Sequence, residues 1–594
     1  DYEQGPWRLD ELFSDFDAPE VQEALDTLEA QVKAFEAFRP QLEPDLDGAK
    51  FREILEAYER LVRQIARLGG YAHLRFAANT QDQQALTFRA QMQQLRAELE
   101  NRTLFFQLWW KGLNKTEAQR LLDESGPYRY WLERLRLYRP YTLSEDEEKV
   151  INLKDVNGVQ ALITLYDSIT SRYTFHLTVD GEEQALTRGE LSVHFRSSNP
   201  DLRAAAYDEL FRVYEDDASI LGQIYRARVL DWRSENLNLR GFDDPMSVRN
   251  LANNVPDDVV DTLLAVSQDN VVIFQRYFEL KARWLGRDQL RRYDVYAPVG
   301  DADKRYSFDD AVNMVLESYY QFEPEIGRLA QRVVDEQHID SEVRTGKRGG
   351  AFCSTITPDL TPWVLQSYQG RPDDVATLAH ELDHAVHSLL ASGHTALTQR
   401  SSLPLAETAS TFGEMLLIDR LLDEESDPSV QHTLLFQQMD DAYATIMRQI
   451  YFALFERMAH EQIYQGASVN DLSELYFQNL QRQFGDSLSL TDNFRHEWVV
   501  IPHIYHTPFY VYAYAFGQLL VFSLYQQYRQ EGEAFKPRYI DILSAGGSDA
   551  PVSILRRAGI EVGSPTFWQG GYDVLRDLLN QLEALTVPEA AQLA

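Results

Sequence analysis

Two histidines and a glutamate in the stretch "TLAHELDHAVHSLL" have the types and the spacing of a metal site with its own general base. His380 and His384 are four positions apart, so on a helix they lie about 40° apart on one face, one turn from each other. Two imidazoles in that relation can bind one metal ion, and Glu381 at the edge of the face can reach a water beside the metal. The H-E-x-x-H string therefore predicts a zinc site.

A zinc site of this kind needs a third protein ligand, and the next segment, "SSLPLAETASTFGEM", offers Glu407. A chain reversal near Gly393 and a helix beginning at Pro404 would return Glu407 antiparallel to the histidines. Glu414, on the same face of that helix, is predicted to accept a hydrogen bond from a ligand histidine. His387 shares the metal face and is expected either to line the cleft or to pack between helices.

A third polar group lies in "PHIYHTPFYVYAYAFG", where histidines and tyrosines alternate with proline breaks. Neutral N–H and O–H donors of this kind can stabilise the oxyanion formed when a carbonyl is attacked. Any single tyrosine here is more often part of an aromatic core. The candidates are His503, Tyr505, His506, Tyr510 and Tyr512.

The elements that must position these side chains are mostly helices. Arg371-Pro372 with two aspartates, and Gly393 after the last periodic residue, predict a helix over about 374–392. Residues 257–285 are predicted to be one long amphipathic helix. Strand signals are few: a hairpin around Asp180-Gly181, and a short antiparallel pair over 351–368, directly before the motif helix. The sequence predicts a mainly α protein with a small antiparallel sheet beside the zinc helix.

The composition of the chain indicates which classes of partner and which cellular compartment to expect. The chain has 594 residues and a formal net charge of −35, and this charge argues against nucleic acid or an anionic membrane surface as a partner. The single cysteine, Cys353, excludes an intramolecular disulfide and fits a reducing compartment. No signal peptide or membrane span is recognised, so a cytoplasmic location is expected. A monomer or a small homo-oligomer is expected.

Together the segments "GKRGGAF", "TLAHELDHAVHS", "PLAETASTFGEM" and "PHIYHTPFYVYAYAFG" resemble the oligoendopeptidase F group of thimet-oligopeptidase-like zinc metallopeptidases, in order and in spacing. The resemblance covers nearly the whole chain. It implies one Zn2+ held by His380, His384 and Glu407, with Glu381 as the general base and proton shuttle. The resemblance also implies that Glu414 lies beside a ligand and that His503 and Tyr512 face the scissile carbonyl, with Tyr505, His506 and Tyr510 as further catalytic candidates. It implies that Gly350, Ala351 and Phe352 lie in a strand that pairs with the peptide.

The same resemblance implies a two-lobed helical ellipsoid with a deep channel that admits short peptides. Three regions are expected: a helical N-terminal region over 1–114, a linking oligoendopeptidase N-terminal-type region over 115–195, and the catalytic region over 196–594. The predicted function is that of a zinc-dependent endopeptidase that hydrolyses short oligopeptides through a zinc-activated water, with Glu381 as base.

One position departs from the family pattern, which usually has glycine where this chain has Asp383. An aspartate there either hydrogen-bonds a nearby donor or spreads the two ligand helices and weakens the metal site. The second outcome gives an alternative function, a peptide-binding protein of the same fold with weakened catalysis. A zinc carboxypeptidase of similar helical build is a further alternative, and it would release single C-terminal residues.

Overall fold

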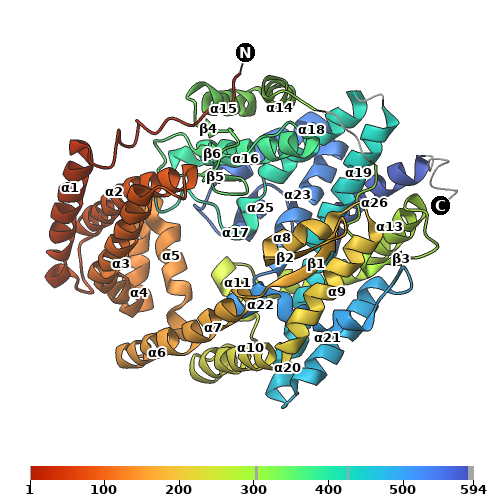
Figure 1. Ribbon diagram of the computed structural model, residues 1–594. Coiled ribbons are helices and arrows are strands. Elements are labelled where there is room, and N and C mark those ends of the chain that lie inside the picture. The colour runs from red at the N-terminus through yellow and green to blue at the C-terminus, as the bar shows by residue number, and fades with distance from the viewer. Residues whose placement is uncertain (1, 301–304, 425–426, 586–594) are drawn as a thin grey trace. The chain divides into compact units, whose positions relative to one another are not determined.

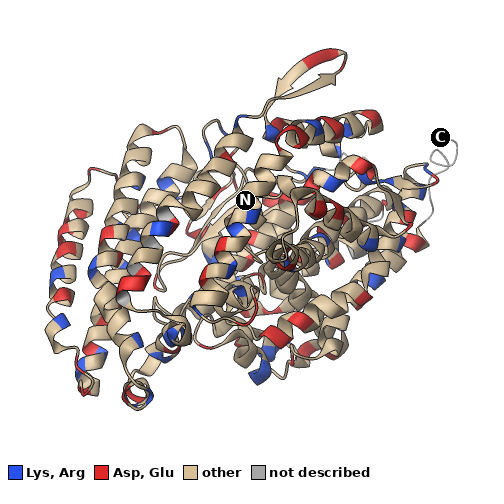
Figure 2. Cartoon of the chain, turned by 90° about the horizontal axis from the view of Figure 1, so that it is seen from below, with Lys and Arg blue, Asp and Glu red and all other residues tan. Residues whose placement is uncertain are grey.

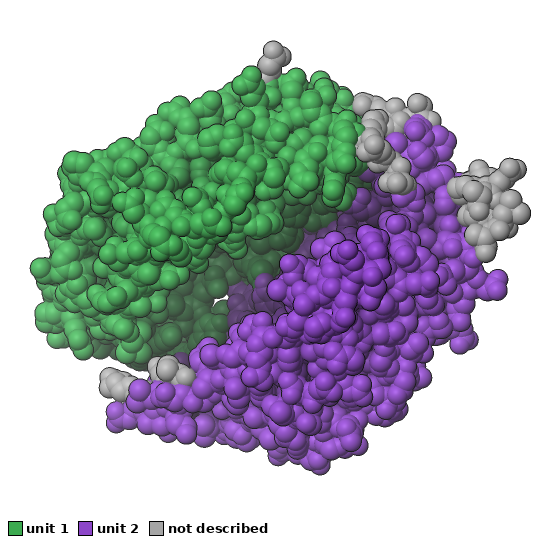
Figure 3. Space-filling model, in the orientation of Figure 1, with its two compact units in different colours: residues 1–139, 304–424, 527–561 green, residues 140–303, 425–526, 562–594 purple. Residues whose placement is uncertain are grey.

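The computed structural model describes residues 2–300, 305–424 and 427–585, and the chain folds into two compact units (Figure 3). Unit 1 comprises 1–139, 304–424 and 527–561, and unit 2 comprises 140–303, 425–526 and 562–594. Each unit is therefore assembled from three separated stretches of sequence. The fold is mainly α, as the sequence predicts, with a few small sheets (Figure 1).

Unit 1 begins with a helical bundle whose core is aromatic. Asp47 caps the longest helix by accepting hydrogen bonds from the backbone N–H groups of Ala49 and Lys50. Phe35, Phe51, Phe106 and Trp110 are fully buried where these helices meet. The helices are α1 (Pro19–Glu36), α2 (Gly48–Ala78), α3 (Gln83–Gly112), α4 (Lys115–Glu124) and α5 (Arg129–Leu137).

The rest of unit 1 surrounds the motif helix, α16 (Pro372–Leu390). A three-stranded sheet in the order β4-β6-β5 packs against α16, with β5 antiparallel and β4 parallel to the central strand β6. The predicted antiparallel pair is confirmed, and β4 adds a strand that the sequence did not indicate. The elements are α14 (Phe308–Phe322), α15 (Pro324–Asp335), β4 (Ile339–Asp340), β5 (Phe352–Ser354), β6 (Trp363–Leu365), α17 (Leu403–Ala406), α18 (Ser410–Glu424), α24 (Lys536–Ser544) and α25 (Pro551–Arg557).

Unit 2 is a second helical assembly with a two-stranded hairpin. The hairpin turns at Asp180-Gly181, as predicted, and both residues have positive φ. The elements are α6 (Glu145–Asn157), α7 (Val159–Ser171), β1 (Phe175–Val179), β2 (Glu182–Leu186), α8 (Arg188–Val193), α9 (Pro200–Asp216), α10 (Ala218–Arg233), α11 (Ser247–Asn253), α12 (Asp257–Asp269), α13 (Val271–Trp284), β3 (Leu290–Arg291), α19 (Pro428–Ala442), α20 (Arg448–Tyr464), α21 (Val469–Phe484), β7 (Leu488–Ser489), α22 (Pro502–His506), α23 (Tyr512–Glu531, whose last turn belongs to unit 1) and α26 (Pro565–Ala584).

Two predicted helices differ from the structure. The helix expected over 257–285 is two helices, α12 and α13, separated at Asn270, whose backbone N–H and side-chain amide both donate to the Val266 carbonyl. The helix expected from Pro404 through Glu414 is also interrupted. It consists of the short α17, a turn at 407–409, and then α18. None of the helices in the described ranges is both long and apolar enough to cross a bilayer.

Candidate active site

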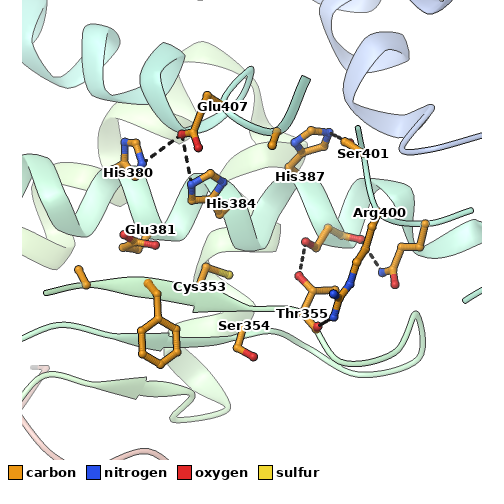
Figure 4. Close-up of a pocket in the computed structure, with 15 residues that line it drawn as sticks. Cys353, Ser354, Thr355, His380, Glu381, His384, His387, Arg400, Ser401 and Glu407 are labelled. Carbon is orange, nitrogen blue, oxygen red and sulfur yellow. Dashed lines mark hydrogen bonds and ion pairs between the residues drawn. The ribbon is translucent and has the colours of Figure 1, made fainter. Parts of the chain in front are cut away.

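Helix α16 begins where the sequence predicts and holds both histidines. Pro372 occupies its first turn, and the Asp374 carboxylate accepts a hydrogen bond from the Arg371 backbone N–H at 2.9 Å. The rings of His380 and His384 meet edge to face, with their centroids 4.9 Å apart. Both side chains project from one face of the helix (Figure 4).

Glu407 lies beside the two imidazoles, although it is in the turn after α17 and not inside a helix. Its Oε2 atom is 3.4 Å from Nε2 of His380 and 3.5 Å from Nε2 of His384. Ser410 fixes the carboxylate by donating its hydroxyl to Oε2 at 2.8 Å. Because Ser410 is the first residue of α18, the same residue that ends the turn also orients the glutamate.

The three side chains fit a zinc ion. Their ligand atoms lie within 4.8 Å of one another. Tetrahedral bonds of about 2.0–2.1 Å place ligand atoms about 3.3–3.4 Å apart, close to the distances that Glu407 makes here. Burial lowers the pKa of His384 to about 4, so its ring is neutral and its lone pair is available. Burial alone would raise the pKa of Glu407, but its contacts, first of all the hydrogen bond with His380, outweigh burial and lower that pKa to about 2. Burial would lower the pKa of His380, but Glu407 and Glu414 outweigh it and raise that pKa well above its usual value, so a metal ion would displace the proton shared by His380 and Glu407.

Glu414 approaches from α18, with Oε2 3.6 Å from Nδ1 of His380. The contact is on the ring nitrogen opposite the one that faces Glu407, where a carboxylate can fix the tautomer of a ligand histidine. The turn at 407–409 that separates α17 from α18 does not keep Glu414 away from His380, because α18 packs closely along α16.

Glu381 points toward the strand side of α16, beside the pocket (Figure 4). It is 7% exposed, and burial raises the pKa of its carboxyl to about 7. A carboxylate with a pKa near neutrality suits a group that must both accept and return a proton. Glu381 itself is not one of the clustered ligand groups.

The pocket around this cluster has a volume of about 550 Å³. Ala351, Phe352 and Cys353 line one wall, and Gly350, with φ of 82°, lies directly before them. His387 also lines the pocket, and its Nε2 lies 2.9 Å from the Ser401 hydroxyl. The sequence left open whether His387 lines the cleft or packs inside the protein. The structure places His387 in the wall of the pocket, with 6% of its surface exposed.

Asp383 is buried where α16 packs against α18. A Cβ atom built on Gly413 would lie only 1.7 Å from Oδ2 of Asp383. The aspartate therefore occupies space that a side chain at position 413 would need. Burial raises the pKa of the Asp383 carboxyl well above its usual range, with Tyr319 opposing the shift. Sequence reasoning missed Gly413, although a glycine inside a helical segment is a recognised signal of close approach.

The predicted histidine and tyrosine group belongs to unit 2. Tyr512 is fully buried, and its hydroxyl accepts a hydrogen bond from the Asn253 amide at 2.9 Å, which leaves the O–H proton available for another acceptor. His503 is half-buried beside the rings of Tyr510 and Tyr514. Asn253 has no signal in the sequence that would have identified it.

Tyr505 and His506, two further candidates of this group, have contacts of their own within unit 2. Tyr505 stacks on Tyr166 with the ring centroids 3.9 Å apart and is 1% exposed. His506 is exposed, and its Nε2 lies 2.8 Å from Asp167. Catalytic roles for Tyr505, His506 and Tyr510 stay predictions, as do those of His503 and Tyr512.

Comparison with known proteins places the chain in a family. The model of peptidase family M3 matches residues 193–574, which is more than half of the chain. The chain belongs to peptidase family M3. The Oligopeptidase F family model matches residues 109–175. This M3 protein is a metallopeptidase, and the resemblance stated from the motifs is confirmed.

Several relatives of this M3 peptidase are named as oligopeptidases or oligoendopeptidases of the F group. It is 26% identical to Oligopeptidase PepF of Bacillus subtilis, covering 98% of this chain and 87% of the relative. It is 26% identical to an oligoendopeptidase F homolog of Borreliella burgdorferi, covering 98% of each chain. The crystal structure of oligoendopeptidase-F from Enterococcus faecium has the same fold, with a TM-score of 0.70 and 22% identity over 95% of this chain and 99% of that one.

Proposed function

We propose that this M3 peptidase is a zinc-dependent endopeptidase that cleaves internal bonds of short oligopeptides. The observation that carries the proposal is the convergence of His380, His384 and Glu407 on one point beside Glu381, in a pocket bordered by a strand. Zinc, when bound by these three residues, supplies Lewis-acid chemistry that polarises a water and a carbonyl oxygen.

Glu381 performs the proton transfers in this proposal. Its carboxylate takes a proton from the attacking water and later gives a proton to the departing amine. Its position on α16, one residue after His380, fixes it next to the metal without making it a ligand. Glu414 and Ser410 hold the ligands His380 and Glu407 in their orientations.

Strand β5 supports a peptide as the substrate. It is the edge strand of its sheet, since it pairs with β6 on one side only among the described strands. Its residues Phe352 and Cys353 border the pocket. An extended peptide can add to such an edge through backbone hydrogen bonds, which bind peptides with little regard to side chain.

His503 and Tyr512 are proposed as donors to the oxygen of the scissile carbonyl, a role that rests on the resemblance to the family. The Asn253 contact supports it for Tyr512, because a hydroxyl that accepts from an amide keeps its own proton to donate. The family's channel and its exclusion of folded proteins are carried over as proposals on the same ground. A cytoplasmic location is proposed because the single cysteine, Cys353, fits a reducing compartment.

The test is a Glu381→Gln variant assayed on an internally quenched short peptide. Loss of the base should lower kcat by about 10²–10⁴-fold while zinc content stays at the wild-type level. Asp373→Asn, an exposed change at the start of the same helix, should retain full activity. A chelator should abolish cleavage, and added Zn2+ should restore it.

Mass spectrometry of the products separates the alternatives. Internal cleavage supports the proposal, whereas stepwise release of C-terminal residues would indicate a carboxypeptidase. Wild-type turnover by Glu381→Gln would rule out the assigned base. Peptide binding without cleavage, in a chain that contains little zinc, would favour the binding protein.

A further inference from the structure

A second group of metal-binding side chains lies in unit 1, away from the motif helix in the sequence. Glu11, Glu336 and His338 present ligand atoms that are all within 4.8 Å of one another. Nε2 of His338 lies 3.9 Å from Oε2 of Glu11. None of these residues has a role in the proposed peptidase reaction.

His338 is held in the orientation of a metal ligand. Its Nδ1 lies 3.1 Å from the Thr361 carbonyl oxygen, which can only accept, so Nδ1 carries the proton and Nε2 carries the lone pair. The ring stacks on Trp363 with centroids 4.3 Å apart. His338 is 1% exposed, and Nε2 has no hydrogen-bond partner among the described residues. A buried lone pair without a donor costs free energy unless something binds it.

The turn between α15 and β4 brings Glu336 next to His338. Gln337 between them has φ of 57°, a left-handed conformation that glycine usually provides. The N–H groups of Gln337 and His338 donate to the carbonyls of Val334 and Val333, which closes the end of the helix. Arg332 donates to Oε1 of Glu336 at 2.9 Å, and the Thr361 hydroxyl lies close to the same carboxylate, whose Oε2 is buried and makes no hydrogen bond of ordinary geometry in the described structure.

Glu11 lies in a turn over 10–12, and the segment directly before it, 2–9, is tied to the α15–β4 turn by backbone contacts. The Arg8 N–H donates to the Gln337 carbonyl at 2.9 Å, and the Trp363 indole donates to the Arg8 carbonyl at 2.7 Å. These bonds fix where Glu11 enters the cluster. Its side chain is 45% exposed, which gives the cluster an opening to water.

We propose that Glu11, Glu336 and His338 form a second zinc site, structural in role, which ties the N-terminal segment to the α15–β4 turn. One imidazole nitrogen, two carboxylate oxygens and a water complete the four ligands that Zn2+ prefers. Two carboxylates balance the charge of the ion. Binding would draw the 3.9 Å pair to about 3.3 Å, the edge of a zinc tetrahedron.

The contacts argue against a simple ion pair as the purpose of the cluster. At 3.9 Å the His338–Glu11 approach is longer than a hydrogen bond. Nδ1 of His338 faces the Thr361 carbonyl, so the Nε2 atom that faces Glu11 presents a lone pair and not a proton. A lone pair beside two carboxylates suits a divalent cation better than it suits a salt bridge.

The site would also brace the sheet next to the catalytic pocket. Trp363, which stacks on His338, belongs to β6, and its partner in the neighbouring strand β5 is Ser354. Strand β5 borders the pocket around His380 and His384. Metal bound at His338 would therefore stabilise the wall on which the peptide is proposed to lie, without taking part in the chemistry.

The test counts zinc in a chain from which the motif site has been removed. H380A/H384A, dialysed against ZnCl2 and analysed by elemental analysis, should retain about one zinc per chain, against about two in the wild type. In that background Glu11→Gln should weaken zinc binding by at least about ten-fold. Glu11 is partly exposed, so the substitution should leave the fold intact, and the exposed change Glu3→Gln should have no effect.

The number of zinc ions per chain does not depend on whether the motif site is catalytic. The proposal of a second zinc site and the proposed peptidase function can therefore fail separately. A folded H380A/H384A chain that takes up no zinc overturns the second site. Zinc uptake that is equal with and without E11Q overturns it too. If H380A/H384A does not fold, the measurement is made on E11Q alone, where zinc should fall from about two to about one per chain with cleavage retained. A content unchanged from wild type overturns the proposal.

Discussion

Asp383 and Gly413 are best understood as one packing unit. The family resemblance made Asp383 look disruptive, because a side chain between the ligand helices needs room. Gly413 supplies that room, since even a Cβ at this position would collide with the aspartate oxygen. The helices α16 and α18 therefore pack closely with the aspartate in place, and the ligand atoms remain within 4.8 Å. This geometry removes the steric reason for expecting a weakened metal site.

Because Asp383 and Gly413 fill the same space, substitutions at the two positions should have effects on stability that are not additive. Gly413→Ala alone should destabilise the protein by about 1–3 kcal/mol through overpacking. With Asp383→Ala present, the same change should cost less than about 1 kcal/mol, because the colliding oxygen is gone and alanine favours the helix. Urea denaturation of the four chains measures the coupling, and zinc content reports on the ligands. Equal costs of Gly413→Ala in both backgrounds would show that the two positions are independent.

At the scale of elements, a buried glutamate organises the turn between α22, which contains His503, and α23, which begins at Tyr512. Phe509 in this turn has φ of 58°, and its N–H donates to Glu456 of α20 at 2.9 Å. Arg249 donates to the neighbouring Pro508 carbonyl at 3.3 Å. Glu456 is fully buried, and burial raises the pKa of its carboxyl from 4.5 to about 8.

This carboxyl predicts a pH dependence of stability. Because the folded protein holds the proton more tightly than the unfolded chain, the stabilisation is fully present below about pH 4.5 and is lost as the pH rises through about 8. The loss approaches about 1.4 kcal/mol per pH unit within that window. Arg249 opposes the shift, and His460, whose pKa burial lowers to about 3, stays neutral throughout.

Glu456→Gln tests this assignment, because glutamine keeps the acceptor for Phe509 and cannot ionise. Denaturation midpoints of the two proteins should be similar at pH 5, and the variant should be the more stable at pH 8.5, by a few kcal/mol. Glu461→Gln, an exposed change on the same helix, should not alter the pH profile. Parallel pH profiles for wild type and Glu456→Gln would mean that Glu456 is ionised in the folded protein.

The elements and the site were predictable from sequence to different degrees. Helix α16 and its two histidines were predictable because proline, aspartate and a regular apolar pattern are local signals. The turn at Glu407 was not, because it depends on where Ser410 directs its hydroxyl. The split likewise lies at Asn270, whose side-chain amide also donates to Gln569, a residue far away in the sequence. The interleaved units and the Glu11–His338 cluster arise from contacts between distant segments, which periodicity does not encode. The region boundaries at residues 114 and 195 stay predictions.

At the scale of the whole molecule, the acidic excess is the dominant feature. The chain has 92 acidic and 57 basic residues, and both kinds are distributed over many helices (Figure 2). A net charge of this size creates a negative potential that extends about 8–10 Å into solution at ordinary ionic strength. Such a field attracts cations and repels anions before any specific contact forms.

The field predicts a charge preference in peptide cleavage that salt removes. Of two quenched peptides that share one cleavage site and differ only in distal lysines or glutamates, the lysine peptide should have the higher kcat/KM, by about ten-fold at 20 mM salt. At about 0.5 M KCl the two values should converge, because ions screen the field. The kcat/KM of a neutral peptide of the same length should change little between the two conditions, so this peptide controls for effects of salt on the enzyme itself.

A charge preference that survives high salt would instead locate the discrimination in direct contacts within the pocket, where Arg400 lies among the lining residues. A preference for the glutamate peptide at low salt would show that the local charge of the pocket outweighs the net charge of −35.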